Sequence, residues 1–234
     1  GNTYLLNLTF PSKLHNVRKL SGIFKASPAP YKLLSTENFV LFSPECFVRI
    51  SGNHIYSFPM KGTIDAGIPN AEELILQNKK EYFEHNTIVD LIRNDLSVVS
   101  HNIAVPRFRF IDRLKTSNKE LLQVSSQIRG ELPENWHKNI GDILLSLLPA
   151  GSVSGAPKAK TIEIIRESEK QDRGFFTGIF GIFNGDSLES GVNIRFIEQT
   201  KNGFFFRSGG GITALSTMDE EYEEMINKVY VPLA

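Results

Sequence analysis

The first quarter of the chain contains runs in which apolar and polar residues alternate, a pattern typical of half-buried strands. Thr3 to Phe10 predicts a first strand, and the β-rich run from Phe39 to Ile50 predicts a second. Residues 51–54 read as a turn, and Ile55 to Phe58 reads as the strand that returns from it, ending at Pro59. We therefore predict a β-hairpin in this region.

Later in the chain the apolar residues recur every three or four positions, which predicts helices. Asn70 is the predicted N-cap of the longest one, and Thr217 and Glu220 have the spacing of a capping box for the last one. Pro157 is expected in the first turn of a third helix. The predicted helices cover 70–99, 142–148, about 157–170, and the chain from 217 onward.

The stretch from Phe175 to Thr213 predicts a meander of three strands. Its two hairpin turns are expected at Asn184-Gly185 and Asn202-Gly203. Strands and helices come in blocks and do not alternate strictly, which favours a mixed α+β fold with mainly antiparallel sheet.

Composition narrows the class of ligand. The 234 residues carry 26 Lys plus Arg and 26 Asp plus Glu, so bulk charge does not attract a nucleic acid or an anionic membrane. No apolar run approaches the ~18 residues of a membrane span, and no export signal is visible. Cys46 is alone, and the five histidines lack zinc spacing. We expect one domain over 1–234, cytoplasmic, with a small ligand and with no nucleic-acid or membrane partner.

Glu45 and Lys61 lie in and just after the first predicted hairpin. If Gly52 and Asn53 form its loop, paired positions sum to 105, so Glu45 faces Met60 and is a neighbour of Lys61. An acid and an amine brought together beside prolines can act on a ligand. The alternative is an ordinary cross-strand ion pair.

Several acidic residues occupy helix positions that call for a partner. Glu84 falls on the apolar stripe of its helix, where a carboxylate needs a cation or a metal ion. It could equally be an edge residue bridged to Arg or Lys. Glu221, Glu224 and Lys228 share a face of the last helix, and such a face is usually solvated.

Arg195 is expected within the central strand of the meander. With Asn202-Gly203 as a type I′ turn, paired positions sum to 405, which places Arg195 opposite Gly210 in the run Gly209-Gly210-Gly211. An arginine beside exposed backbone N–H groups is a reasonable carboxylate site. The alternative is a tight bulge with the arginine in solvent.

The segment from Gly151 to Lys158 precedes a helix and invites comparison with a phosphate-binding loop. It does not match, because only three residues separate its glycines and Ala156-Pro157 follow the second one. Nucleotide binding is therefore a weak alternative.

Taken together, these segments resemble the chorismate-utilising enzymes, which include anthranilate, aminodeoxychorismate, isochorismate and salicylate synthases. The resemblance covers nearly the whole chain in the family's order, which favours the functional interpretations above over the structural ones. The matching segments are Ser43-Pro-Glu-Cys-Phe47, Pro59-Met-Lys-Gly-Thr63, Glu84-His-Asn-Thr-Ile-Val-Asp-Leu-Ile-Arg-Asn-Asp95, Gly151 to Lys158, Asn193-Ile-Arg195, Gly209-Gly-Gly-Ile212 and Glu221-Tyr-Glu-Glu-Met-Ile-Asn-Lys228.

The resemblance implies a fold and an activity. The fold of the anthranilate synthase component I type has antiparallel sheets packed face to face with helices outside. Lys61 stands where anthranilate and isochorismate synthases usually have alanine and aminodeoxychorismate synthases have lysine. The resemblance is therefore strongest to aminodeoxychorismate synthase component I, which converts chorismate and ammonia to 4-amino-4-deoxychorismate for p-aminobenzoate and folate synthesis. Anthranilate synthase, isochorismate synthase and a truncated, non-catalytic chorismate-binding module are the alternatives.

The resemblance also implies roles for individual residues. Glu45 would be the general acid and Lys61 the nucleophile, while Glu84 and Glu224 would bind Mg²⁺. A separate glutamine amidotransferase subunit would supply the ammonia. The residues implied to bind substrate are Thr63, Ser154, Arg195, Gly209, Gly210, Gly211 and Lys228.

Three departures from the family pattern stand out. Gln123 occupies the place of a histidine found in many members, and Phe176 replaces a tyrosine or tryptophan. Members also have a longer N-terminal portion that pairs with the first strand, whereas here that strand begins almost at residue 1. We therefore expect an N-terminal portion to be absent from this sequence.

Overall fold

The computed structural model describes residues 2–15, 17, 19–115 and 120–232. By its internal contacts the chain forms two compact units that alternate along the sequence. Unit 1 comprises Gly1–Phe47, Val153–Ile182 and Ser190–Ala234, and unit 2 comprises Val48–Ser152 and Phe183–Glu189. The two units are described separately below, and the prediction of one domain over the whole chain stays a prediction.

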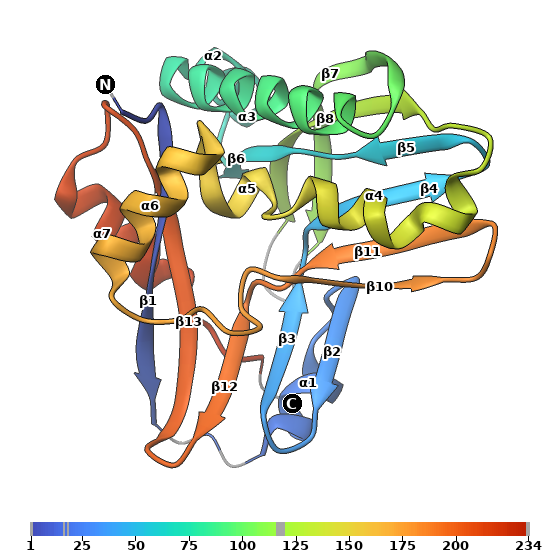
Figure 1. Ribbon diagram of the computed structural model, residues 1–234. Coiled ribbons are helices and arrows are strands. Elements are labelled where there is room, and N and C mark those ends of the chain that lie inside the picture. Colours follow the sequence, from blue (N-terminus) through green and yellow to red (C-terminus); the bar gives the residue numbers. More distant parts are fainter. Residues whose placement is uncertain (1, 16, 18, 116–119, 233–234) are drawn as a thin grey trace. The chain divides into compact units, whose positions relative to one another are not determined.

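Unit 1 contains a sheet, in the order β2-β3-β12-β13-β1-β9, together with the helices α1, α6 and α7 (Figure 1). Its elements are β1 (Leu5–Leu14), α1 (Leu20–Ala26), β2 (Tyr31–Ser35), β3 (Phe39–Ser43), β9 (Gly155–Ala156), α6 (Lys158–Glu169), β12 (Phe196–Thr200), β13 (Gly203–Ile212) and α7 (Met218–Asn227).

Unit 2 is built on a second sheet, in the order β10-β11-β4-β5-β8-β6, with β7 paired to β8. Its elements are β5 (His54–Ser57), β6 (Met60–Asp65), α2 (Ala71–Gln77), α3 (Lys79–Ser97), β7 (His101–Lys115), β8 (Glu120–Glu131), the 3₁₀ helix η1 (Trp136–Asn139) and α4 (Ile140–Leu147). Four elements have residues in both units: β4 (Cys46–Ser51), α5 (Gly151–Ser154), β10 (Ile179–Phe183) and β11 (Ser187–Val192).

The core of unit 1 is centred on β3, which is buried at every position. Successive side chains of a strand point to opposite faces, so a strand buried on both faces is apolar throughout. One face packs against α1 in the cluster Leu20, Ile23, Val40, Phe42, Ile197 and Phe206. The other forms the cluster Phe39, Leu41, Phe176 and Phe196. Phe176, which replaces a tyrosine or tryptophan of the family, is thus a core residue.

The core of unit 2 lies between its sheet and the helix α3, with α2 beside it (Figure 1). Leu122, Val124 and Ile128 of β8 are almost fully buried, as are Ile88 and Leu96 of α3. These α3 residues belong to the apolar stripe predicted from the sequence. The helix is therefore held to the sheet by the face that periodicity identified.

The α+β fold with antiparallel sheets is confirmed, but two of the predicted strands are interrupted. The run 39–50 forms β3 and β4, which belong to different sheets and are separated by Pro44 and Glu45. The predicted meander is likewise four strands, because residues 193–195 separate β11 from β12. Proline lacks the N–H that a strand ladder needs, which explains the first interruption.

The predicted helix 70–99 is two helices, α2 and α3, which meet at Asn78. The Asn78 side chain accepts a hydrogen bond from Glu81 N at 3.1 Å and so caps α3. Asn70 precedes α2 with a φ of 57° and makes no side-chain cap. Asn70 therefore stands at the predicted helix start, but the side-chain cap is made by Asn78, at the start of the second helix.

The strand β1 has partners on both edges. It pairs with β13 from Leu6↔Ile212 to Leu14↔Phe204, and with β9 at Leu5 and Leu6. The sequence suggested that this strand lacked a partner, and both of its partners come from much later in the chain. The expectation that an N-terminal portion is absent from this sequence stays a prediction.

Candidate functional site

Lys61 lies at an irregularity in the ladder between β6 and β8. The strand pair runs in register up to Met60↔Ser125 and resumes one residue out of step at Thr63↔Gln123. Lys61 and Gly62 together oppose one residue of β8, which is a β-bulge. Bulges redirect side chains at such points. Gly62 has a φ of +80°, which favours glycine.

The Lys61 side chain meets Glu84 of α3. Its Nζ lies 3.5 Å from Glu84 Oε2, and the two side chains are only 26% and 13% exposed. A Cβ atom at Gly62 would stand 3.0 Å from Glu81 Oε2, so the glycine leaves room for a second carboxylate of the same helix. The predicted cationic partner of Glu84 is thus the predicted nucleophile.

A buried polar network, not predicted from the sequence, adjoins this pair. His85 is 0% exposed, and its Nε2 lies 2.7 Å from Ser126 Oγ, which also accepts a hydrogen bond from Arg109 N at 2.9 Å. Burial, followed by the charges of Arg109 and Lys61, lowers the pKa of His85 to about 4. His85 precedes Ile88 by three positions, so helical spacing would have placed it on the buried face.

Arg109 connects this network to α2. Its guanidinium donates to Leu76 O at 3.0 Å and lies over the ring of Tyr82. Its backbone has a φ of +50°, an uncommon conformation for a side chain of this size. The strained residue is held by the hydroxyl of Ser126 and by the end of α2, which fixes β7 beside the helices.

Thr63 and Gln123 are directly opposite each other on β6 and β8. Gln123 is flanked on its other side by Asp112 of β7. Thr63 is exposed, and Gln123 is partly buried. The side chain that replaces the family histidine is therefore one strand away from a predicted substrate-binding residue.

The first hairpin has the predicted register. The pairs Arg49↔Tyr56, Ile50↔Ile55 and Ser51↔His54 all sum to 105. The ladder does not extend to Glu45 and Met60, however, since β4 begins at Cys46 and Met60 pairs with β8. The prediction that hairpin pairing places Glu45 opposite Met60 and next to Lys61 is therefore wrong.

Glu45 belongs to unit 1, in the link between β3 and β4. Its carbonyl accepts a hydrogen bond from Val192 N, and its own N–H is held by Ser43 Oγ at 3.1 Å. The backbone that carries this carboxylate is therefore fixed at both of its polar groups.

The glycine run lies on β13 where one of its two ladders has ended. Pairing with β12 stops at Arg207, whereas pairing with β1 continues through Thr9↔Gly209, Leu8↔Gly210 and Asn7↔Gly211. A Cβ atom at Gly209 would come 2.1 Å from Leu8 O, so this approach requires glycine. The run thus lies beyond the β12 ladder and pairs with β1.

Lys228, at the end of α7, lies against this run. Its Nζ donates to Gly209 O at 3.0 Å and to Glu224 Oε1 at 2.5 Å. Three of the predicted site residues in unit 1 are thus brought together. Thr217 caps α7 as predicted, since its Oγ1 accepts from Glu220 N.

Arg195 is not opposite Gly210, so that prediction is wrong. The β12–β13 ladder pairs Thr200 with Gly203 and Phe196 with Arg207, a sum of 403 in place of 405. Arg195 precedes β12 with a φ of +51°, and its guanidinium lies 5.7 Å from the Tyr230 ring centroid. The arginine is placed by a local break in the strand and not by strand pairing.

Ser154 ends the short helix α5 and is 2% exposed. The segment compared above with a phosphate-binding loop thus begins as this helix, and β9 follows it. Gly155 has a φ of +131°, and a Cβ atom there would come 2.0 Å from Leu5 O. The residues after Ser154 are thus fixed against β1.

Unit 1 also has a cavity of about 550 Å³ between β1, β13 and α7. Its wall is mainly apolar and includes Leu8, Phe10, Gly210, Tyr222 and Met225. Neither Arg195 nor Lys228 lines it. The cavity therefore shares Gly210 with the predicted substrate site but lacks the cationic side chains that a dicarboxylate would need.

Within the described residues, no three His, Cys, Asp or Glu side chains gather as a metal cluster. Glu84 belongs to unit 2 and Glu224 to unit 1, so their sharing of one ion stays a prediction. Across the same residues, no helix combines the length and the apolar character that a membrane crossing needs.

Comparison with protein families gives one match over the whole chain: the family described as chorismate binding enzyme, over residues 1–234. A protein of Haemophilus influenzae named as an uncharacterised PabA-like protein is 57% identical over 233 residues, which are 100% of this chain and 71% of that protein. Aminodeoxychorismate synthase component 1 of Bacillus subtilis is 31% identical over 98% of this chain and 51% of its own length.

The solved structures that share the fold include two biosynthetic enzymes. Anthranilate synthase component I from Streptococcus pneumoniae has a TM-score of 0.80 at 24% identity, over 97% of this chain and 52% of that one. The menaquinone-specific isochorismate synthase MenF of Escherichia coli has a TM-score of 0.79 at 20% identity, over 97% and 55%. The chain spans about half the length of these two proteins. The full-length family match and the closely related PabA-like protein show that this chain belongs to the chorismate binding enzyme family.

Proposed function

We propose that this protein converts chorismate and ammonia to 4-amino-4-deoxychorismate. Lys61 carries the proposal, because aminodeoxychorismate synthases have lysine at this position. Its bulged backbone and its contact with Glu84 support a directed role for the amine. The relatedness to an aminodeoxychorismate synthase component 1 agrees with this choice.

In the proposed reaction the neutral Lys61 amine adds to C2 of chorismate. The ring double bonds shift, and the C4 hydroxyl leaves as water with a proton from Glu45. Ammonia then adds at C4, the double bonds shift back, and the C2–N bond to Lys61 breaks. The net change is loss of water and gain of ammonia, and the lysine is regenerated.

The remaining residues would hold the substrate. Lys228 and the backbone of Gly209–Gly211 form one group in unit 1 and would suit a carboxylate, since an ammonium attracts it and glycine backbone can be approached closely. Arg195 and Ser154 would add further donors. In unit 2, Thr63 and the neighbouring Gln123 would contact the substrate ring, with Gln123 donating from its amide where the family has histidine.

The donor chemistry of Glu84 and Glu224 fits a magnesium ion, because Mg²⁺ prefers carboxylate oxygens and keeps part of its water shell. We propose that these two residues hold the ion. When bound, it would neutralise a substrate carboxylate. Each glutamate has a lysine beside it, Lys61 and Lys228 respectively, at 3.5 and 2.5 Å.

A partner glutamine amidotransferase would supply the ammonia in this proposal. Relatives with PabA-like names are consistent with such chemistry. With free ammonium in the assay, activity should not require the partner.

Product analysis tests the proposal. The chain is incubated with chorismate, ammonium and Mg²⁺, and the products are identified by mass spectrometry. We expect 4-amino-4-deoxychorismate. Anthranilate or isochorismate as the sole product would assign one of the alternative activities, and chorismate binding without turnover would indicate a non-catalytic module.

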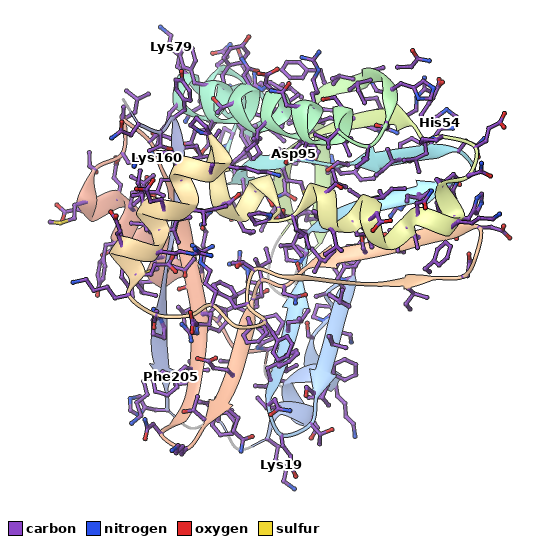
Figure 2. The ribbon with its side chains drawn as sticks, viewed as in Figure 1. Lys19, His54, Lys79, Asp95, Lys160 and Phe205 are labelled. Carbon is purple, nitrogen blue, oxygen red and sulfur yellow. The ribbon has the colours of Figure 1, made fainter. Side chains whose placement is uncertain are left out.

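Trapping the covalent intermediate tests the nucleophile. Without ammonium, intact-mass analysis should detect a chorismate-derived adduct on the wild-type chain and none on Lys61→Ala. Lys79→Ala is the matched control, since Lys79 is an exposed lysine at the start of α3 (Figure 2). An adduct that persists in Lys61→Ala would exclude Lys61.

A further inference from the structure

The carboxylate of Glu84 forms an ion pair with the side-chain amine of Lys61. Lys61 Nζ lies 3.5 Å from its Oε2, and with 26% and 13% exposure the pair is largely shielded from water. Screening by solvent and salt is weak for such a pair. Any cation that binds Glu84 therefore encounters the charge of Lys61 at short range.

The backbone leaves Lys61 little freedom to move far from Glu84. The amine extends from a β-bulge whose neighbour, Gly62, has a φ of +80°. Ser126 N donates to Pro59 O at 3.0 Å just before the bulge, and the hydroxyl of Ser126 contacts His85, the residue after Glu84. Ser126 thus ties the residue before the bulge to the helix residue next to Glu84.

The other charged side chains nearby do not cancel the repulsion between Lys61 and a cation bound to Glu84. Glu81, one helical turn before Glu84, is near Gly62, and Arg109 adds a second positive charge beside His85. Lys61 is the cation in contact with the carboxylate itself. Its effect on a metal ion is therefore direct.

We propose that Lys61 competes with the divalent ion for Glu84, so that metal binding and the position of the nucleophile are coupled. The inference rests on the proposed metal role of Glu84. The ion displaces the ammonium from the carboxylate, and the ammonium in turn weakens the binding of the ion. The proposed nucleophile would thus lower the affinity of Glu84 for the metal ion.

Coulomb's law sets the size of the effect. A monocation about 5 Å from a dication repels it, even at a water-like dielectric constant of about 80, by enough to lower affinity more than about tenfold. Removal of the charge should recover at least that factor, since the competing ion pair is lost as well.

The test measures Mn²⁺ binding to the chain by the electron paramagnetic resonance of the free ion, without substrate. We expect Lys61→Met to bind Mn²⁺ at least tenfold more tightly than wild type, and Lys61→Arg, which keeps the charge, to bind with wild-type affinity. Lys79→Met removes a charge from the start of the same helix α3 and should change affinity less than twofold.

The Glu84→Gln variant distinguishes failure of the proposed competition from failure of the proposed metal role of Glu84. If Glu84→Gln binds Mn²⁺ as wild type does, or if neither wild type nor Lys61→Met binds it, the proposed metal role of Glu84 fails and the inference fails with it. If Glu84→Gln loses binding but Lys61→Met binds no more tightly than wild type, the metal role stands and the competition is refuted.

Discussion

Replacing Glu169 by alanine should destabilise unit 1 strongly. Glu169 ends α6, and its carboxylate is 1% exposed. It accepts hydrogen bonds from Thr9 N at 2.8 Å and Thr9 Oγ1 at 3.0 Å, both on β1. Arg173 donates to it through Nε at 2.9 Å and Nη2 at 2.6 Å. One side chain thus satisfies a strand and an arginine at once.

The magnitude follows from what the truncation leaves behind. Removing one partner of a buried ion pair costs about 3–5 kcal/mol, because the other charge stays buried without compensation. Arg173 retains two acceptors, Val153 O and Asn7 O, both at 2.8 Å, which offsets part of the loss. The N–H of Thr9, in a residue 1% exposed, loses its carboxylate partner and adds about 1–3 kcal/mol. We expect a total loss of at least about 3 kcal/mol.

The same helix provides the control. Glu163 pairs with Lys160 at 2.7 Å, but these side chains are 54% and 44% exposed (Figure 2 labels Lys160). Exposed pairs contribute about 0–1 kcal/mol, so Glu163→Ala should change stability little. Urea unfolding followed by circular dichroism measures both variants. A loss in Glu169→Ala no larger than that in Glu163→Ala would refute the reasoning.

Two further predictions concern unit 2. Because the pKa of His85 is lowered from 6.5 to about 4, the unfolded chain binds more protons below pH 6.5, so stability should fall by up to about 3 kcal/mol between pH 6.5 and 4. Urea unfolding at several pH values should show a shallower acid loss in His85→Leu than in wild type, and equal slopes would contradict the assignment. Gly62→Ala should slow adduct formation at Lys61 and destabilise the chain by about 1–3 kcal/mol, because φ is +80° and its Cβ would meet Glu81. Gly52→Ala, with a φ of +55° and open space around it, is the control and should leave the adduct rate unchanged; equal adduct rates in the two variants would rule out the positioning role of Gly62.

Local sequence rules predicted the structure correctly where a single local interaction determines it. The hairpin of β4 and β5 has the predicted register because its two-residue loop, Gly52-Asn53, fixes every pair that follows. Thr217 caps α7 because a hydroxyl there meets the N–H three residues on. The buried stripe of α3 follows from helical spacing alone.

The same rules failed where a turn could form in two ways. Asn202-Gly203 suggested a type I′ turn, which requires a positive φ at both residues. Of these two residues, Gly203 alone has a positive φ, at +112°. The loop therefore consists of residues 201–202, and Gly203 is the first residue of β13. This shift of one loop position changes every cross-strand pair by two in the sum. It is enough to move Arg195 away from Gly210.

Contacts between distant segments could not be predicted at all. Thr9 and Glu169 are 160 positions apart, and nothing in either local pattern marks the other as a partner. The network of His85, Ser126 and Arg109 likewise joins two strands and a helix. Sequence spacing identifies a buried position, but it does not say which buried polar groups will meet there.

The residues assigned to chemistry lie where the regular structure is interrupted. Lys61 is in a bulge, Glu45 is between β3 and β4, Arg195 precedes β12 with a positive φ, and Gly209–Gly211 extend past the β12 ladder. Within a continuous ladder, the backbone groups are paired and strict alternation sets the direction of each side chain. An interruption releases both constraints, so a side chain can be turned and a backbone N–H can reach a ligand. A substitution that restores regular pairing at such a point should therefore affect the reaction more than the stability of the chain.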